Sequence, residues 1–232
     1  MPAFNAASTI YRSITSVIFQ TYPNWKIIIR DDMSTDGTVA VIESIKKNLN
    51  LSDDKITLTV NTEKMWEVRN IVESLKETDS NDIICRLDGD DWLCDTDILT
   101  IIDHSYRTKN CDVLWTSHRW GFTKHNISGP MPKNADPYTY PWVSSHFKTF
   151  RKFLIENVSD ENFRGSDGEY FKRIGDQAIY LPILYKAKGN WHHEPIVAYH
   201  YTVEIDNQIF QTNDALFQKK EAEFLRTRGF VS

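Results

Sequence analysis

The sequence lacks three features that would each indicate a particular class of protein. It has no apolar run near the ~20 residues that a helix needs to cross a bilayer, so no membrane span is expected. Its formal net charge of −5 offers no general attraction to a polyanion, which disfavours nucleic acid or a membrane surface as the main partner. Its 3 cysteines are an odd number without the spacing of metal ligands, so no disulfide framework or zinc site is indicated.

The start of the sequence also lacks the basic segment and apolar stretch of a secretory signal. Together with the cysteines, this predicts a cytoplasmic protein, in the host cytoplasm if the chain is viral. The composition that is present is that of an ordinary globular protein, with 41% hydrophobic and 25% charged residues. A chain of 232 residues can bury the core of one large α/β domain.

Strand-like and helix-like segments alternate through the first half of the chain, which predicts a doubly wound, mainly parallel sheet flanked by helices. Apolar runs predict strands at 25–29, 55–60, 82–87 and 112–116. Apolar residues at helical spacing predict helices near 10–18, 39–45, 68–75 and 98–102.

The second half is less regular. Between His118 and Tyr140 the periodicity disappears and glycine and proline accumulate, which predicts a long loop. Further segments follow, predicted as helices at 147–155, 176–186 and 212–228 and as a strand at 195–201. The aromatic residues concentrated between 115 and 153 fit either an acceptor groove or simple core packing.

Two acidic loops follow two of the predicted strands, one starting at Asp31 and the other at Asp88. Ligands of an open α/β sheet gather beyond the carboxyl ends of its strands, so we expect both loops at one site. Asp88, Asp90 and Asp91 repel one another, and a divalent cation such as Mg²⁺ or Mn²⁺ would relieve that repulsion. Gly89 would allow a tight turn between them. Taken alone, the same turn also fits a solvated cap of the next helix.

Five blocks of the sequence carry a family resemblance: PAFNAA (2–7), SVIFQTY (16–22), IIRDDMSTDGT (28–38), RN (69–70) and LDGDDW (87–92). In this order and at these separations they resemble the family 2 glycosyltransferases, and the set is far more specific than any one motif. SHFKTFR (145–151), DGEYF (167–171) and GDQAI (175–179) resemble a branch of that family found in bacteria and large viruses.

The resemblance implies a GT-A fold and an enzyme that moves a sugar from a nucleotide diphosphate donor to an acceptor hydroxyl. It further implies inversion at the sugar, a Mn²⁺ or Mg²⁺ cofactor bound at a DxD motif, a donor that is favoured to be a UDP-sugar, and a glycan as the acceptor. The expected division of the chain is a nucleotide-sugar-binding half (1–117), a half with the acceptor site and catalytic base (118–211), and a C-terminal helix (212–232).

The resemblance also implies roles for residues of the donor site. Phe4 and Asn5 match the end of the first strand, where base and ribose rest. Asp31 matches the carboxylate that accepts a hydrogen bond from the base edge. Arg69 matches the block that approaches the donor, where a planar guanidinium suits a diphosphate. Asp88 is assigned to the nucleotide sugar.

Two further roles follow from the same resemblance. Asp90 and Asp91 are assigned to the metal, and Asp176 matches the position of the catalytic base. An inverting transfer needs a carboxylate that removes the proton of the attacking hydroxyl. The alternative for Asp176 is a purely structural role as the N-cap of a helix, where aspartate is also favoured.

Basic residues of the second half permit several interpretations. His146, Lys148 and Arg151 form a cationic stretch that fits either the diphosphate or a solvated helix face. Three further histidines, His192, His193 and His200, lack the spacing of a zinc site and are interpreted as structural, with His200 as a minor candidate near the metal.

The sequence departs from the family at its start, because the apolar strand that normally precedes the first block is almost absent. A central strand has neighbours on both sides. Its loss would leave two rows of backbone N–H and C=O groups that need other hydrogen-bond partners. This places the tightness of nucleotide binding in question, but not the family.

Three rival functions stay open. A nucleotidyltransferase is disfavoured because the first glycine of the chain is Gly37, too late for a glycine-rich phosphate loop. A catalytically silent sugar-binding protein would keep the same fold. A virus-encoded enzyme that glycosylates a modified DNA base is disfavoured by the acidic balance of the chain.

Overall fold

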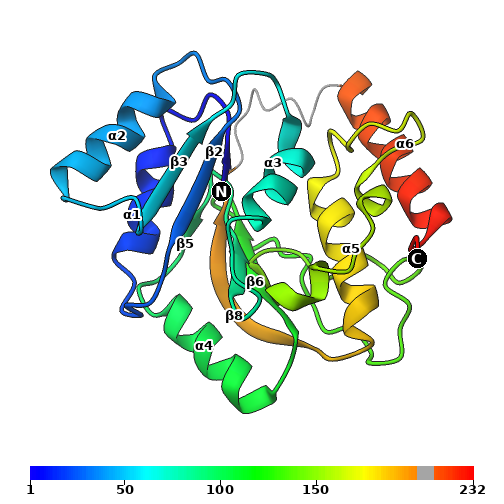
Figure 1. The fold of residues 1–232 in the computed structure, drawn as a ribbon. Coiled ribbons are helices and arrows are strands. Elements are labelled where there is room, and N and C mark those ends of the chain that lie inside the picture. The colour runs from blue at the N-terminus through cyan, green and yellow to red at the C-terminus, as the bar shows by residue number, and fades with distance from the viewer. Residues whose placement is uncertain (203–211) are drawn as a thin grey trace.

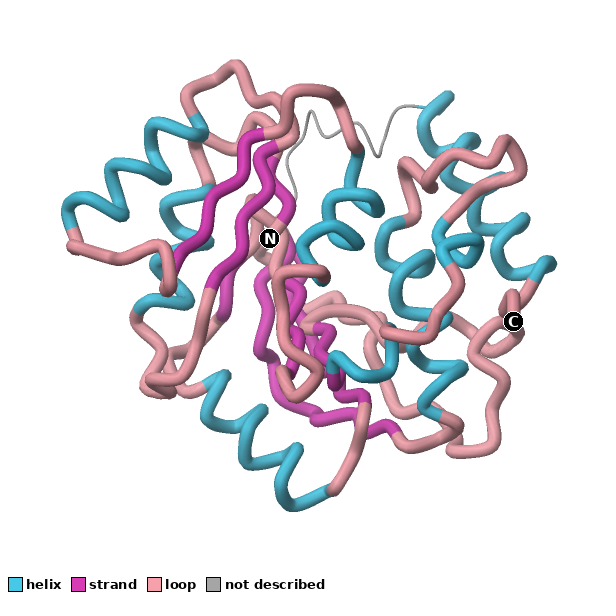
Figure 2. The backbone as a smooth tube through the Cα atoms, viewed as in Figure 1, coloured by secondary structure: helices cyan, strands magenta, loops and turns pink. Residues whose placement is uncertain are grey.

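The computed structural model describes residues 1–202 and 212–232. Its strands gather in the middle of the molecule between two groups of helices (Figures 1 and 2). In Figure 1, α1 (Ile10–Ile18) and α2 (Thr38–Asn48) lie on one side of the strands, and α5 (Gly175–Ala187) and α6 (Thr212–Arg228) lie on the other.

The first sheet contains three parallel strands in the order β1-β2-β3. They are β1 (Pro2–Ala3), β2 (Ile27–Asp31) and β3 (Ile56–Val60). Every second residue of β2 is buried, and Ile29 packs with Ile10 and Ile42 of α1 and α2 in one core cluster. The alternation of helices and strands predicted for the first sixty residues is therefore confirmed. These helices and strands share one apolar interior.

The first strand is short, as expected, but its backbone groups find partners on both sides. On one side, Ala3 pairs with Asp31 of β2. On the other, the amide of Gly89 donates to the carbonyl of Pro2 at 3.2 Å. A turn that follows β4 thus takes part of the place of a neighbouring strand, which satisfies groups that would otherwise be buried without partners.

The second sheet has five strands in the order β4-β7-β6-β8-β5. They are β4 (Ile83–Arg86), β5 (Trp92–Leu93), β6 (Val113–Trp120), β7 (Lys148–Arg151) and β8 (Trp191–Tyr201). Only β6 and β8 run parallel to each other; the three other pairings are antiparallel. The predicted α/β fold with a parallel sheet is confirmed, and its second sheet is mixed.

One predicted element is wrong. The helix expected at 147–155 is strand β7 followed by a 3₁₀ turn, Lys152–Ile155. Lys148, Thr149 and Phe150 are all buried, and β7 pairs with β4 on one side and β6 on the other. The conformation of this segment is therefore determined by its pairing with two neighbouring strands and not by the local spacing of its apolar residues.

Helix α5 is buried almost all round and fixes the second sheet from one face. The Tyr180 hydroxyl lies 3.0 Å from the carbonyl oxygen of Leu114 on β6 and 2.9 Å from that of Thr149 on β7. This buried hydroxyl holds the helix at a set height over the two strands. Asp176, one turn earlier on the same helix, is thereby held above β7.

The other helices are α3 (Trp66–Leu75), α4 (Ile98–Lys109) and a second 3₁₀ turn at Asp160–Phe163. The predicted C-terminal helix is confirmed as α6, and Arg226 on it donates to the side chain of Gln177 on α5 at 2.7 Å. Among the described residues, no helix is both long enough and apolar enough to cross a membrane.

Most of the aromatic residues between 115 and 153 belong to the core. Trp115, Tyr138, Phe147 and Phe150 are buried, whereas Phe122 projects fully into solvent. The core explanation therefore accounts for most of these rings, and Trp120, Phe122 and Phe153 are the ones left exposed or partly exposed outside it.

Candidate active site

The two acidic turns meet beside β1. Asp31 ends β2 and is paired in register with Ala3, while Gly89 of the second turn bonds to Pro2. The hydroxyls of Thr9 and Ser13, at the start of α1, also donate to the Gly89 carbonyl, at 3.2 and 2.8 Å. Two aspartate clusters more than fifty residues apart are thus held at the same short strand.

Gly89 is required by close packing and not by an unusual backbone angle, because its φ is not positive. A Cβ at this position would lie 3.1 Å from the Pro2 carbonyl oxygen, 3.2 Å from Cδ1 of Ile10 and 3.3 Å from Cβ of Ala3. The expected tight turn is present, since the amide of Asp91 donates to the carbonyl of Asp88 at 3.2 Å, and Gly89 also brings it close to the backbone of β1. We therefore attribute this glycine to the junction of the turn with β1.

Gly89→Ala is expected to destabilise the protein by ~1–3 kcal/mol, the usual cost of overpacking a core. It should also weaken donor binding, because the turn that carries Asp88 and Asp90 must move away from β1. Urea denaturation and donor titration measure the two effects. Gly129→Ala is a matched control, since a Cβ there meets no atom within 4 Å. Equal stability of the two variants would contradict this reading of Gly89.

Asp31 is fully buried but only half satisfied. Its Oδ1 accepts from the amide of Ser34 at 2.9 Å, and its Oδ2 has no partner. A buried carboxylate oxygen without a donor is costly, so a ligand that brings an N–H to it would be stabilised. The geometry suits the role in base recognition predicted for Asp31.

The turn after Asp31 is tied to the loop after β1. Asn5 adopts a left-handed conformation, with φ of 47°, and its Oδ1 accepts from the amide of Thr35 at 2.9 Å. The amide of Asn5 donates to Oγ of Ser34, also at 2.9 Å. Phe4 beside it is half exposed, with Nζ of Lys64 2.9 Å from its ring centre. The loop that carries Phe4 and Asn5 is therefore tied to the turn after Asp31, and the half-exposed Phe4 ring has the Lys64 ammonium over one face.

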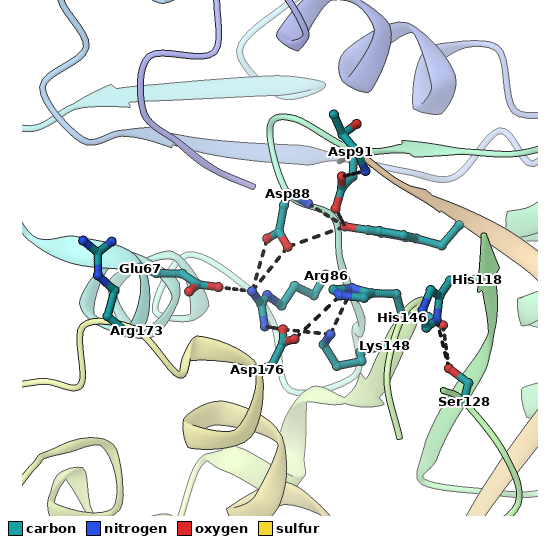
Figure 3. Close-up of polar contacts among 12 residues, drawn as sticks. Glu67, Arg86, Asp88, Asp91, His118, Ser128, His146, Lys148, Arg173 and Asp176 are labelled. Atoms are coloured by element: carbon teal, nitrogen blue, oxygen red, sulfur yellow. Dashed lines mark hydrogen bonds and ion pairs between the residues drawn. The ribbon is translucent and has the colours of Figure 1, made fainter. Parts of the chain in front are cut away.

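Arg69 does not join the acidic residues of the second turn. Its guanidinium pairs with Glu63 at 2.9 Å, on the partly exposed surface of α3. The cation among those acids is Arg86, the last residue of β4 (Figure 3). Arg86 contacts the carboxylates of Glu67, Asp88 and Asp176, with 3.3 Å to Oδ1 of Asp88.

Sequence reasoning missed Arg86 although a signal was present. Arg86 stands two residues before Asp88 at the end of a predicted strand, and side chains at that spacing point to the same face where the strand continues. Glu67 carried no comparable signal, because it reaches Arg86 from another element, α3.

The three aspartates of the second turn have different surroundings. Asp91 is buried, and its oxygens accept from the Tyr199 hydroxyl and the Thr202 amide, both at 2.7 Å. Burial raises the pKa of Asp91 well above its usual range, and the neighbouring Asp90 and Asp88 raise it further. Asp90 is exposed, and the contacts of Asp88 to Arg86 are long. Of the two predicted metal ligands, Asp90 is therefore the better placed.

Asp176 lies in the first turn of α5, where its carboxylate faces nitrogen groups of three other residues. The N-cap of this helix is Ile174, so the capping explanation for Asp176 does not hold. Its carboxylate contacts Nζ of Lys148 at 2.8 Å, the guanidinium of Arg86, and Nε2 of His146 at 3.6 Å. Burial alone would raise the pKa of Asp176, but Lys148, and next Arg86, hold it well below its usual value.

The cationic stretch after the long loop divides into an inner and an outer part. His146 and Lys148 are buried against Asp176, as Figure 3 shows, whereas Arg151 faces Asp112 at 3.6 Å. The explanation of this stretch as a solvated helix face is wrong, because the segment is a central strand.

The other histidines are structural, as expected. His200 stacks on Trp92 with ring centres 3.8 Å apart, and His192 pairs with Glu194 at 3.4 Å. His193 lies beside the ring of Trp115.

The residues of the site fit a divalent cation, and they offer two alternative positions for it. Within the described part of the chain, the one group of three possible ligands is Asp88, His146 and Asp176, whose ligand atoms lie within 4.8 Å of one another. Lys148 and Arg86 already supply positive charge there. The exposed carboxylate of Asp90 lies outside that group and offers oxygen ligands of the type that Mg²⁺ and Mn²⁺ prefer.

Three comparisons with known proteins bear on this site. A family model described as glycosyl transferase family 2 matches residues 1–159. The chain is 38% identical over 94 residues to the UDP-Glc:alpha-D-GlcNAc-diphosphoundecaprenol beta-1,3-glucosyltransferase WfgD of Escherichia coli, which covers 40% of this chain and 34% of that protein. It is 23% identical over 210 residues to a GalNAc(5)-diNAcBac-PP-undecaprenol beta-1,3-glucosyltransferase of Campylobacter jejuni, covering 86% of this chain and 62% of the other.

Among solved structures, a mannosyltransferase from Pyrobaculum calidifontis in complex with GDP-Man and Mn²⁺ matches with a TM-score of 0.70 at 15% identity, covering all of this chain and 64% of the other. S. aureus TarS in complex with UDP-GlcNAc matches with a TM-score of 0.66 at 16% identity, covering 91% and 59%. These likenesses show the GT-A fold. The chain spans about a third of the length of WfgD. Since the family model covers more than half of the chain, the protein belongs to glycosyl transferase family 2.

Proposed function

We propose that the chain transfers a sugar from a nucleoside diphosphate sugar to a hydroxyl of a glycan, with inversion and with the help of a divalent cation. One observation carries the proposal: Asp31 and the Asp88 turn converge on β1, and Asp88 is joined through Arg86 to the partly exposed carboxylate of Asp176. A base-binding acid, an acidic turn and a general base are then linked within one site.

The donor is proposed to be a UDP-sugar. The orphan oxygen of Asp31 is suited to accept a hydrogen bond from the N–H of a uracil ring, and the half-exposed ring of Phe4 is carried by the loop tied to the turn after Asp31. TarS was solved with UDP-GlcNAc and the mannosyltransferase with GDP-Man, so related folds accept different nucleotides. The fold alone does not select the base, and Asp31 is the residue that argues for uracil.

Asp90 would hold the cation together with the donor's diphosphate, with Asp88 directed to the nucleotide sugar and Asp91 as a further ligand. When bound, the cation neutralises the charge that builds up on the departing diphosphate. Asp91 is bonded through both oxygens to Tyr199 and Thr202, so its main effect is to fix the turn.

Asp176 acts as the general base in this proposal. The hydroxyl proton of the acceptor passes to its carboxylate, and the freed oxygen bonds to the anomeric carbon. The bond from that carbon to the diphosphate breaks, and its electron pair leaves with the diphosphate. With its pKa held low, Asp176 is ionised at neutral pH but weakly basic. It accepts the proton late, once the attacking oxygen has become acidic.

The acceptor is proposed to be a glycan. Tyr201 lies between His146 of the site and Trp120 at the end of β6, with ring centres 5.3 and 5.7 Å apart. Both tyrosine and tryptophan are partly exposed, and such rings can pack on a sugar face. Residues 1–117 would then serve the donor and residues 118–202 the acceptor, with β6 shared between them. The segment 203–211, included in the predicted acceptor half, lies outside the described residues.

A thermal-shift screen of nucleoside diphosphate sugars, with and without Mn²⁺, tests the proposal. A ligand at 100 times its Kd stabilises the folded state by ~2.7 kcal/mol, which raises Tm by roughly 5–10 °C in a domain of this size. We expect a UDP-sugar to give this shift only with Mn²⁺, and Asp90→Ala to lose most of it.

Asp95→Ala is the matched control, an exposed aspartate beyond the acidic turn. If no nucleoside diphosphate sugar shifts the Tm of the wild type, the donor proposal fails. A shift without any metal-dependent hydrolysis or transfer of the sugar would favour the catalytically silent binding protein instead.

A further inference from the structure

Two buried cations face each other across neighbouring strands of the second sheet. Arg86 of β4 and Lys148 of β7 are directly paired in the antiparallel register. Like charges placed opposite each other destabilise a sheet, and burial increases the cost. The Lys148 side chain is only 1% exposed, so solvent does not relieve it. This pair is stable only because an anion lies against both cations.

Asp176 supplies that anion from α5. It contacts Nζ of Lys148 at 2.8 Å and the guanidinium of Arg86 on the same carboxylate oxygen, Oδ1. Its side chain is 31% exposed, whereas Lys148 is closed off behind it. An acceptor can therefore reach Asp176, but it cannot reach Lys148.

His146 contacts both Lys148 and Asp176, and these contacts determine which of its ring nitrogens carries the proton. Nζ of Lys148 lies 3.1 Å from Nδ1 of His146, and an ammonium can only donate, so Nδ1 is the acceptor. With Nδ1 accepting, the ring proton is on Nε2, which faces Oδ2 of Asp176 at 3.6 Å. Each oxygen of Asp176 thus faces an N–H group.

We propose that Lys148 is a positioning residue of the transfer reaction: its buried ammonium, braced by His146, orients the Asp176 carboxylate toward the acceptor hydroxyl. This inference rests on the proposed function, in which Asp176 is the base. Lys148 touches neither donor nor acceptor, so its effect passes entirely through Asp176. Arg86 serves Glu67 and Asp88 as well, and Lys148 is therefore the more specific probe.

The test is a double-mutant cycle between Lys148→Met and Asp176→Asn, read in kcat. Misplacing a catalytic group costs roughly 10–100-fold, and we expect a loss of kcat of that order for Lys148→Met with little change in the donor KM. In the Asp176→Asn background the same substitution should have almost no further effect, because the group it positions is already inactive. Lys148→Arg should recover part of the rate.

Lys152→Met is the matched control, because Lys152 follows β7, is also nearly buried, and pairs with Glu156 away from the site. Its kcat should be unchanged. Independent losses that multiply in the double variant, or a loss in donor affinity equal to the loss in kcat, would overturn the inference.

A second readout does not depend on turnover. The losses in Tm of Lys148→Met and Asp176→Asn should be less than additive, since either substitution breaks the same ion pair. If the wild type transfers no sugar while this coupling is present, the proposed function fails and the ion pair stands. If the wild type is active but the coupling is absent in both Tm and kcat, the inference about Lys148 fails.

Discussion

Asp176→Asn is expected to lower kcat by roughly 10²–10⁴-fold, the usual contribution of a general base, while the chain still binds its donor. Asparagine has almost the same shape as aspartate but cannot take the hydroxyl proton. Asp176 lies across Arg86 from Asp88, so the acidic turn at β1 should keep its structure. Initial rates of transfer to a glycan and a donor titration measure the two quantities.

The control for this prediction is Asp103→Asn, which removes a surface carboxylate that pairs with Arg107 on α4. That variant should turn over like the wild type. Wild-type turnover by Asp176→Asn would show that another group removes the proton, and the assignment of the base would then be wrong.

Arg86→Met is expected to give the largest loss of stability, ~3–5 kcal/mol, the range for breaking a buried ion pair from one side. The substitution leaves Glu67, Asp88 and Asp176 without the guanidinium that they share. Methionine is long and apolar, so the loss of charge dominates over a loss of packing. Urea denaturation at neutral pH measures the change in the free energy of unfolding.

The pH dependence of this loss follows from Asp176. Its pKa in the folded state lies below the ordinary value of 3.8, so its ion pairs stabilise the protein above that pH and are lost as the pH falls through the folded value. The difference in the free energy of unfolding between the wild type and Arg86→Met should therefore become smaller in acid. Arg107→Met, at an exposed pair, should stay within ~0.5 kcal/mol of the wild type. A gap that widens in acid would contradict the assignment.

The first sixty residues could be predicted because local pattern and tertiary environment agree there. Most apolar positions of α1 and β2 face one core cluster, so their spacing reports the true contacts. Strand β7 could not be predicted in this way. Lys148 looks like a surface residue, and only its two neighbouring strands and the carboxylate from α5 make its burial possible.

In the candidate site, too, some residues could be predicted from the sequence and others depend on contacts between distant elements. Asp31 and Asp88 could be predicted from their places at the ends of strands, and Asp176 from the family pattern. The partners of Asp176 could not, because Arg86 and His146 reach it from separate elements. Asp91 was assigned to the metal with Asp90 from the family pattern, yet hydrogen bonds from Tyr199 and Thr202, at the end of the neighbouring strand β8, give it a different environment.

We propose that the two acidic turns form one binding site for a nucleoside diphosphate. Calorimetric titration of UDP in the presence of Mn²⁺ tests this most directly, with the wild type, Asp31→Asn and Asp88→Asn side by side. We expect each single substitution to weaken the binding of the same UDP molecule, with the stoichiometry at one. Wild-type affinity in either variant would show that its turn takes no part in the site, and the two turns would then not form one site.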